Sequence, residues 1–183
     1  DVLGITNSTS TENDNVYEDF QQQLANCDDG HYETNLMGKP GCTDLPSNET
    51  GSKRRTQGLL KRLNRDPEKL EIYPNLIQEQ LESGIVVRAD STDCPKQFFI
   101  PHKMVTREDA ETTKNRVVFD ASAKANEHSP SLNDCLETGP SLNNQLWSIL
   151  VRMQFKPIVL TGDLKKAFLQ IRIRKEDRGV LQF

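Results

Sequence analysis

The sequence predicts an α+β fold in which helices and short strands follow one another along the chain. Apolar residues recur at helical spacing in residues 53–83, whereas β-branched and aromatic residues dominate residues 97–105 and 116–120. The first 50 residues are rich in Asn, Ser, Thr, Asp and Gly, which is typical of a flexible segment. We therefore expect an acidic, largely flexible linker over residues 1–50, a mixed region over residues 51–156 and a last region over residues 157–183.

Composition and charge limit the class of protein. Hydrophobic residues make up 34% of the 183 residues and the mean hydropathy is −0.67, so we expect part of the chain to be poorly packed. No apolar stretch approaches the roughly 20 residues of a membrane span, and no signal peptide is expected. Residues 1–50 hold ten Asp/Glu and one Lys, whereas residues 51–183 hold 22 Lys/Arg and 17 Asp/Glu. The basic part suits a polyanion such as nucleic acid, but it also suits a solvated surface.

The four cysteines show no metal-site spacing. They contain no Cys-x-x-Cys pair, and the three histidines (His31, His102, His128) are isolated in sequence. We expect reduced thiols in an intracellular protein rather than a zinc site or a disulfide framework. The thiols are Cys27, Cys42, Cys94 and Cys135.

Three stretches precede the basic region. "NSTSTENDN" (Asn7–Asn15) predicts a loop or disordered stretch, and "VYEDFQQQLAN" (Val16–Asn26) predicts a short helix with one apolar face. "GKPGCTDLPSNETGS" (Gly38–Ser52) predicts a linker.

Two helices are expected next. Lys53–Arg65 is basic and helical in pattern, and Asp66–Glu68 begins a second helix with a capping aspartate, a proline and an acid. Pro74 should kink or divide this second helix, and Gly84 should end it. The first helix should place three leucines on one side: Leu59, Leu60 and Leu63.

Strands are expected after Gly84. "GIVVRA" (Gly84–Ala89) and "QFFIPHKMV" (Gln97–Val105) are rich in strand-forming residues. The polar stretch Thr106–Asn115 should be the turn of a hairpin whose second strand is "RVVFD" (Arg116–Asp120).

The last third of the chain predicts a helix followed by two strands. Ser141 should cap a helix that runs to Met153, and Pro157 should end this helical region. "IVLTGD" (Ile158–Asp163) should be a buried strand. Alternation over Leu169–Arg174 predicts a strand with one solvated, basic face.

Two polar residues could carry chemistry. Asp163, at the end of the expected buried strand, could bind a hard cation or could cap the following turn. Arg116 could grip a phosphate with its planar guanidinium group, with Lys114 nearby, or could be a solvated strand end paired with Asp120. The aromatic residues Phe168 and Trp147 are expected to pack in the core.

Several motifs in this order and spacing resemble the reverse transcriptase of BEL/Pao retrotransposon polyproteins. They are "LKRLNRDPEKLEIYPNLIQEQLESGIV", "RVVFDASAK", "SLNDCLETGPSLNNQL" and "LTGDLKKAFLQIRIRKEDRGVLQF". "GHYETNLMGK" resembles the element that precedes the polymerase, although Met37-Gly38 stands where the family usually has Pro-Trp. The resemblance implies reverse transcriptase fingers and a fingers–palm connection over residues 51–156, and the start of the palm over residues 157–183.

The resemblance also implies roles for individual residues. Asp163 would be the first metal-binding carboxylate of a two-Mg²⁺ nucleotidyl-transfer site, with the Leu164 carbonyl as a second ligand. Phe168 falls at the steric gate that excludes a ribose 2′-hydroxyl, and Arg116 falls at the arginine that contacts the incoming deoxynucleoside triphosphate. Lys114 is a further candidate for binding the deoxynucleoside triphosphate. From its charge alone, the basic helix near Lys53–Arg65 is expected to lie near the template. Two weaker candidates for nucleic-acid contacts are Gln170 and Arg172.

The resemblance implies an RNA template, a DNA primer or duplex and deoxynucleotides as partners, in a cytoplasmic particle, with a nuclear stage left open. The second and third palm motifs, including the Tyr-x-Asp-Asp turn, are not in the sequence, nor are thumb, ribonuclease H and integrase parts. We therefore expect a polymerase fragment or the product of a degenerate element, inactive alone. The alternative is a non-catalytic nucleic-acid-binding fragment.

Overall fold

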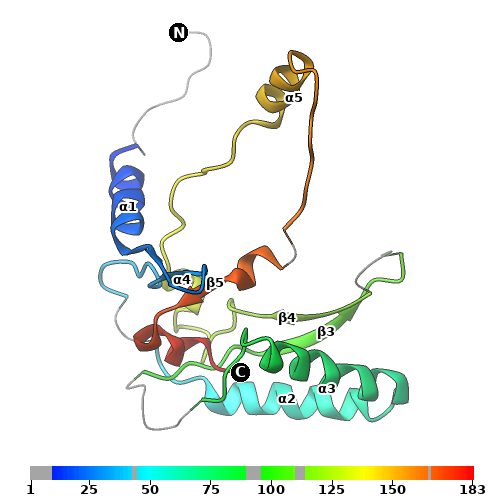
Figure 1. Ribbon diagram of the computed structural model, residues 1–183. Helices are drawn as coiled ribbons and strands as arrows, with labels where there is room; N and C mark the ends of the chain where they lie inside the picture. Colours follow the sequence, from blue (N-terminus) through cyan, green and yellow to red (C-terminus); the bar gives the residue numbers. More distant parts are fainter. Residues whose placement is uncertain (1–9, 43–44, 90–95, 110–113, 165) are drawn as a thin grey trace. The chain divides into compact units, whose positions relative to one another are not determined.

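The protein has the α+β fold that the sequence predicts. The computed structural model describes residues 10–42, 45–89, 96–109, 114–164 and 166–183 (Figure 1). The chain divides into two compact units, each made of segments that are distant in sequence. Unit 1 comprises Asp1–Thr34 and Glu137–Arg172, and unit 2 comprises Asn35–Leu136 and Ile173–Phe183. The expected boundaries after residues 50 and 156 stay predictions about domains, and the compact units divide the chain at other positions.

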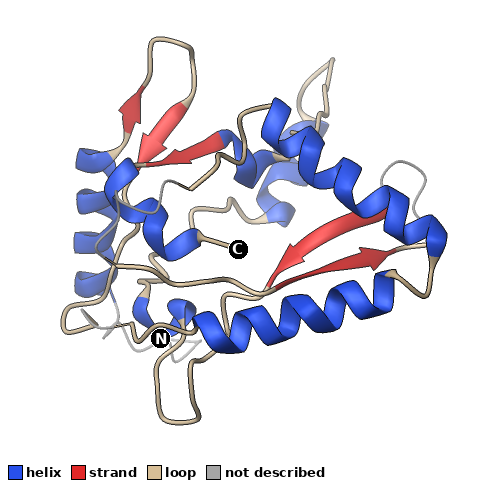
Figure 2. Ribbon diagram, turned by 90° about the horizontal axis from the view of Figure 1, so that it is seen from below, coloured by secondary structure: helices blue, strands red, loops and turns tan. Residues whose placement is uncertain are grey.

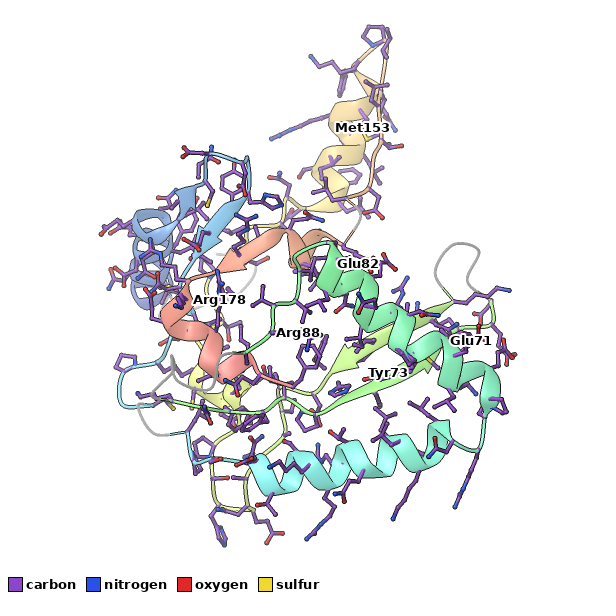
Figure 3. All side chains as sticks on the ribbon, turned by 60° about the horizontal axis from the view of Figure 1, so that its bottom comes forward. Glu71, Tyr73, Glu82, Arg88, Met153 and Arg178 are labelled. Carbon is purple, nitrogen blue, oxygen red and sulfur yellow. The ribbon has the colours of Figure 1, made fainter. Side chains whose placement is uncertain are left out.

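Unit 2 is built around two helices and a hairpin. Helices α2 (Glu49–Leu63) and α3 (Pro67–Glu82) lie along strands β3 (His102–Thr106) and β4 (Asn115–Phe119) (Figures 1 and 2). The two strands pair antiparallel, as the sequence predicts. A core lies between these four elements and is formed by Leu59, Leu63, Tyr73, Ile77, Met104 and Val117. Figure 3 shows Tyr73 on the side of α3 that faces the hairpin.

Helix α3 begins and ends as its sequence predicts. The carboxylate of Asp66 accepts a hydrogen bond from the Lys69 N–H, and Pro67 occupies the first turn. At the other end Gly84 takes a φ of +71°, and the Ile85 N–H donates to the Gln80 carbonyl at 3.0 Å. This pairing is a Schellman motif, which satisfies carbonyls of the last turn.

A second core in unit 2 surrounds Phe98. Phe98 is fully buried and packs with Ile100 and Leu132. Leu132 opens the short helix α4 (Leu132–Cys135), which begins with a capping box between Ser131 and Asp134. The unit ends in the 3₁₀ helix η2 (Lys175–Leu181), where the Gly179 carbonyl accepts from the Phe98 N–H at 3.0 Å.

Unit 1 contains two helices, a 3₁₀ helix and a small sheet. Its helices are α1 (Ser10–Gln23) and α5 (Leu146–Gln154), and η1 is Ala167–Gln170. Strands β1 (Ala25–Asn26), β2 (Tyr32–Thr34) and β5 (Ile171–Ile173) form the sheet in the order β1-β2-β5.

Several sequence predictions for the first half of the chain are wrong. Of the stretch Asn7–Asn15, Ser10–Asn15 is helical rather than a loop, and residues 7–9 lie outside the described residues. Glu49–Ser52 belongs to α2 rather than to a linker. Leu60 is 49% exposed, because Leu59 and Leu63 are the leucines turned toward the hairpin. Pro74 does not divide α3, which runs without a break from Pro67 to Glu82, and a kink at Pro74 stays a prediction.

The expected strand Gly84–Ala89 does not form. The N–H groups of Ile85 and Val86 both donate to the Gln80 carbonyl, so the end of α3 uses the donors that a strand ladder would need. The expected strand over Gln97–Val105 is shorter than predicted, because β3 begins at His102 and only an isolated bridge forms at Phe99.

The predictions for residues 141–163 are confirmed only in part: a helix forms before Pro157, but its start and the following strand are wrong. Helix α5 begins at Leu146 rather than after Ser141, and Gln145 caps it without a side-chain hydrogen bond. No residue of α5 is buried, so this stretch lacks the packing that normally stabilises a short helix. Residues 158–163 form no strand, and Leu160 is 92% exposed. A strand needs a partner, and none of the described residues pairs with these.

Candidate nucleotide and nucleic-acid site

The outer face of the β3–β4 hairpin carries Arg116. Side chains of alternate residues point to opposite faces, and the inner face holds Met104 and Val117 against the helices. Arg116 therefore lies on the other face, where it is exposed and opposite Val105. Lys114 precedes the strand and is exposed, and its carbonyl accepts a hydrogen bond from the Arg107 N–H at 2.7 Å.

Lys103 is a second cation on this outer face, and it was not among the candidate residues predicted from sequence. Its register partner is Val118, two residues along the strand from Arg116. Such diagonal neighbours lie about 7–8 Å apart, within reach of long side chains. Residues 102–106 do not alternate between polar and apolar, so only the strand register shows that Lys103 lies on this face.

The expected pairing of Arg116 with Asp120 is wrong. Asp120 instead forms an ion pair with Arg55 of α2, with 2.8 Å between Nη1 and Oδ2. Among the described residues, no side chain forms an ion pair or hydrogen bond with the guanidinium group of Arg116. Its five N–H donors are therefore available for a ligand such as a phosphate.

Asp163 lies in unit 1, in the extended segment between α5 and η1. Its side chain is exposed, and it is neither the end of a buried strand nor a helix cap. The cap position of η1 belongs to Lys166, whose φ is +53°. Leu164 is adjacent and its side chain is 77% exposed. Lys165 lies outside the described residues.

The other candidate residues of unit 1 discussed above also have exposed side chains. Phe168 is 96% exposed on η1, which corrects the expectation of a core residue. Gln170 is the exposed last residue of η1. Trp147 on α5 is 72% exposed and does not pack in a core as expected. An exposed aromatic ring costs free energy in water unless a partner covers it.

Arg172 already forms an ion pair with an acidic side chain. It lies on β5, and its Nη1 is 2.6 Å from Oδ2 of Asp29, which follows β1. The His31 N–H, and then Arg172, hold the pKa of Asp29 below its usual range. Arg172 therefore stabilises the small sheet, and sequence spacing gave no sign of this pair.

The described residues do not by themselves provide a two-metal site. No group of three or more His, Cys, Asp or Glu side chains converges among them. Asp163 contributes one carboxylate, whereas two Mg²⁺ ions require several oxygen ligands and more negative charge. These residues therefore do not fit a complete magnesium centre.

His102 is not isolated in the fold. It stacks on Tyr73 with ring centroids 6.0 Å apart, and it contacts the edge of Phe183 at 5.3 Å and lies 6.1 Å from Phe119. Burial lowers the pKa of His102 below its usual value and raises the pKa of Tyr73 to about 12. This aromatic cluster is structural, and its four members come from distant segments that no local pattern connects.

Two of the thiols meet in unit 2. Gly38 bridges Leu136, and the Lys39 N–H donates to the Cys135 carbonyl at 2.8 Å, which brings the turn at Cys42 beside Cys135. Burial, together with the neighbouring thiol of Cys42, raises the pKa of Cys135 to about 11. Both are free thiols, as is Cys27, and Cys94 lies outside the described residues.

Comparisons with known proteins do not identify a family for this chain. In the described part of the chain, no helix has the length and apolar character needed to cross a membrane. No protein-family model, no curated protein and no solved structure matches this chain.

Proposed function

We propose that this chain is the N-terminal part of the reverse transcriptase of a BEL/Pao-type retrotransposon, comprising the fingers and the first palm motif. The observation that carries the proposal is the order and spacing of the motifs from Arg116, Ser131 and Thr161 onward. An α+β fold with a hairpin covered by two helices is compatible with it.

The exposure of the three main candidate side chains supports this proposal. Asp163, Phe168 and Arg116 all lie on the surface, and no described side chain neutralises Arg116. Arg116 would hold phosphate oxygens of a deoxynucleoside triphosphate with its guanidinium fork. The ring of Phe168 would exclude a 2′-hydroxyl by steric overlap.

Asp163 would supply one carboxylate for Mg²⁺, and other parts of the polyprotein would supply the remaining ligands. In this proposal the 183-residue chain does not extend a primer by itself, because one carboxylate does not hold two ions. Its partners are the RNA template, the DNA primer and the remainder of the polymerase.

Primer extension by a longer form of the protein, one that includes the rest of the palm, tests the proposal. Asp163→Asn should reduce synthesis at least about 1,000-fold, because catalysis depends on charge stabilisation by the bound metal. The matched control is Asp109→Asn, an exposed aspartate in the hairpin turn, which should leave synthesis within threefold. Full synthesis by the Asp163→Asn enzyme would remove the metal-ligand role.

The alternative is a non-catalytic nucleic-acid-binding fragment, and the balance of 22 Lys/Arg against 17 Asp/Glu in residues 51–183 favours it. A degenerate element is a further alternative, favoured by the exposed apolar side chains of residues 146–168. A longer form that binds nucleic acid but never extends a primer, even without substitutions, would support the first alternative.

A further inference from the structure

Helix α2 carries an exposed row of cations on the side turned away from the core. Leu59 and Leu63 face the hairpin and are 4% exposed. At about 100° per residue, Arg54 lies about 180° around the helix from Leu63. Lys61 falls within about 20° of Arg54 on the same projection, and Arg65 lies in the turn that follows α2. Figure 3 shows long nitrogen-tipped side chains that extend from α2 on this side.

The cations of this row are not neutralised within the described part of the chain. Arg54, Lys61, Arg62 and Arg65 are exposed, and none forms an ion pair with a described residue. The other two cations of the helix are paired, Lys53 with Glu49 and Arg55 with Asp120. No acidic residue occurs between Glu49 and Asp66. Arg62 lies about 80° around α2 from Arg54, between the row and the core side, and Arg65 follows the helix. We refer to Arg54, Lys61 and Arg62, together with Arg65 of the following turn, as the cationic face of α2.

Gly58 leaves this face open in its centre. It lies one turn after Arg54, and a Cβ atom at this position would contact nothing within 4 Å. Glycine inside a helix costs about 0.5–1 kcal/mol relative to alanine, and the packing of this chain does not require it here. An open backbone between cations permits close approach of an extended, charged partner.

We propose that the cationic face of α2 binds the phosphodiester backbone of a nucleic acid. The span from Arg54 to Arg62 is about 12 Å at 1.5 Å per residue, a length over which a duplex carries about seven negative charges. Flexible Lys and Arg side chains spaced along such a span contact phosphates independently of base sequence. The choice of nucleic acid as the polyanion rests on the proposed function.

The structure disfavours an anionic membrane as the occupant. A helix that lies in a membrane interface inserts its apolar face among the lipids. The main apolar residues of α2, Leu59 and Leu63, are instead buried in the chain's own core. Leu60 alone is half-exposed, and it lies away from the cationic face.

The test measures binding of the 183-residue chain to a fluorescent primer–template duplex at 50, 100 and 200 mM KCl. The quadruple variant Arg54→Gln, Lys61→Gln, Arg62→Gln and Arg65→Gln should bind at least 100-fold more weakly at 50 mM. The slope of log K against log salt should fall by about 3.6, since each of the four phosphate contacts contributes about 0.9. Thermal melting of each variant verifies that the core is intact.

A matched pair of double variants controls for net charge. Arg54→Gln/Lys61→Gln should weaken binding about tenfold, whereas Lys53→Gln/Arg55→Gln should change it less than threefold. Both pairs remove two charges from the same helix, but the second removes cations that already have acidic partners. Gly58→Gln should also weaken binding without altering net charge, because its side chain would occupy the open centre.

The outcomes separate this proposal from the proposed function. Strong binding by the quadruple variant, or equal losses in the two double variants, overturns the cationic face and leaves the polymerase assignment standing. No binding by the unsubstituted chain at 50 mM, or preferential binding to anionic phospholipid vesicles, also overturns it. Loss of synthesis in the Asp163→Asn enzyme tests only the proposed function, since Asp163 is not part of this face.

Discussion

At the scale of single residues, Asn48 ties two distant segments of unit 2 together. It is 4% exposed, and its Nδ2 donates to the Phe99 carbonyl at 2.6 Å. Its Oδ1 accepts from the Phe99 N–H at 2.8 Å, and the Ser52 hydroxyl also donates to the Phe99 carbonyl. The amide of Asn48 thus pairs with both the N–H and the carbonyl of Phe99, the neighbour of the fully buried Phe98.

Replacing Asn48 should therefore destabilise unit 2. Asn48→Ala leaves the Phe99 N–H without its partner and should lower the free energy of unfolding by about 1–3 kcal/mol. Asn48→Asp should cost at least as much, because a carboxylate has no N–H for the carbonyl that it would face. Urea unfolding measures both. Ser47→Ala, on the exposed neighbour, should change stability by less than about 0.5 kcal/mol, and equal effects at both positions would contradict this role.

The candidate residues show how far a single residue can be interpreted from sequence. The place of Arg116 at the start of a hairpin strand was predictable, because Val117, Val118 and Phe119 favour a strand. The partners of Asp120 and Arg172 were not predictable. Each pairs with a residue more than 60 positions away, and ion-pair partners have no local sequence signal.

At the scale of elements, replacing glycine with alanine should have opposite effects on stability at two positions. Gly84 ends α3 with a φ of +71°, whereas Gly58 lies inside α2, and neither position has an atom within 4 Å of an added Cβ. Gly84→Ala should destabilise the chain by about 1 kcal/mol through backbone strain alone. Gly58→Ala should stabilise it by about 0.5–1 kcal/mol by reducing the entropy of the unfolded chain.

Thermal melting of the two alanine variants measures this pair. The melting temperature should fall for Gly84→Ala and rise for Gly58→Ala. A fall for both would mean that Gly58 has a structural role within the chain, and this would also weaken the inference that the centre of α2 is open to a partner.

Elements with strong local signals were predicted well. The cap and proline at Asp66 and Pro67 and the glycine at Gly84 act through contacts within a few residues, so the sequence shows them directly. Residues 158–163 illustrate the opposite case. Their apolar run predicts a strand, but a strand exists only by pairing, and no described segment pairs with it.

At the scale of the whole molecule, the aromatic cluster makes the stability of unit 2 dependent on pH. His102 is held by Tyr73 of α3, Phe119 of β4 and the C-terminal Phe183, and its burial lowers its pKa. The unfolded chain therefore binds more protons than the folded chain just below the usual histidine pKa of about 6.5. Stability should rise with pH through this range and decline as pH falls below it.

Melting temperatures between pH 5 and pH 7.5 test this linkage. The increase in melting temperature with pH should be smaller in His102→Phe, which keeps an aromatic ring in the cluster but cannot take up a proton. The exposed His128→Phe variant should retain the slope of the unsubstituted chain. An unchanged slope in His102→Phe would assign the pH dependence to carboxylates instead.

The sequence alone determined the features that depend on neighbouring residues. These are the α+β class, helix α3 with its ends, the presence of helix α2, the β3–β4 hairpin, and a basic stretch between Lys53 and Arg65. Helical periodicity, caps and strand alternation are local preferences, so they can be identified without knowledge of the rest of the chain.

Only the tertiary structure decided which side chains are buried, paired or free. It buried Leu59 and Leu63 and thereby turned Arg54 and Lys61 outward, it gave Arg55 and Arg172 acidic partners, and it left Phe168 exposed. These outcomes depend on contacts between segments that are distant in sequence. Such contacts are set by the packing of the whole chain, which no window of neighbouring residues specifies.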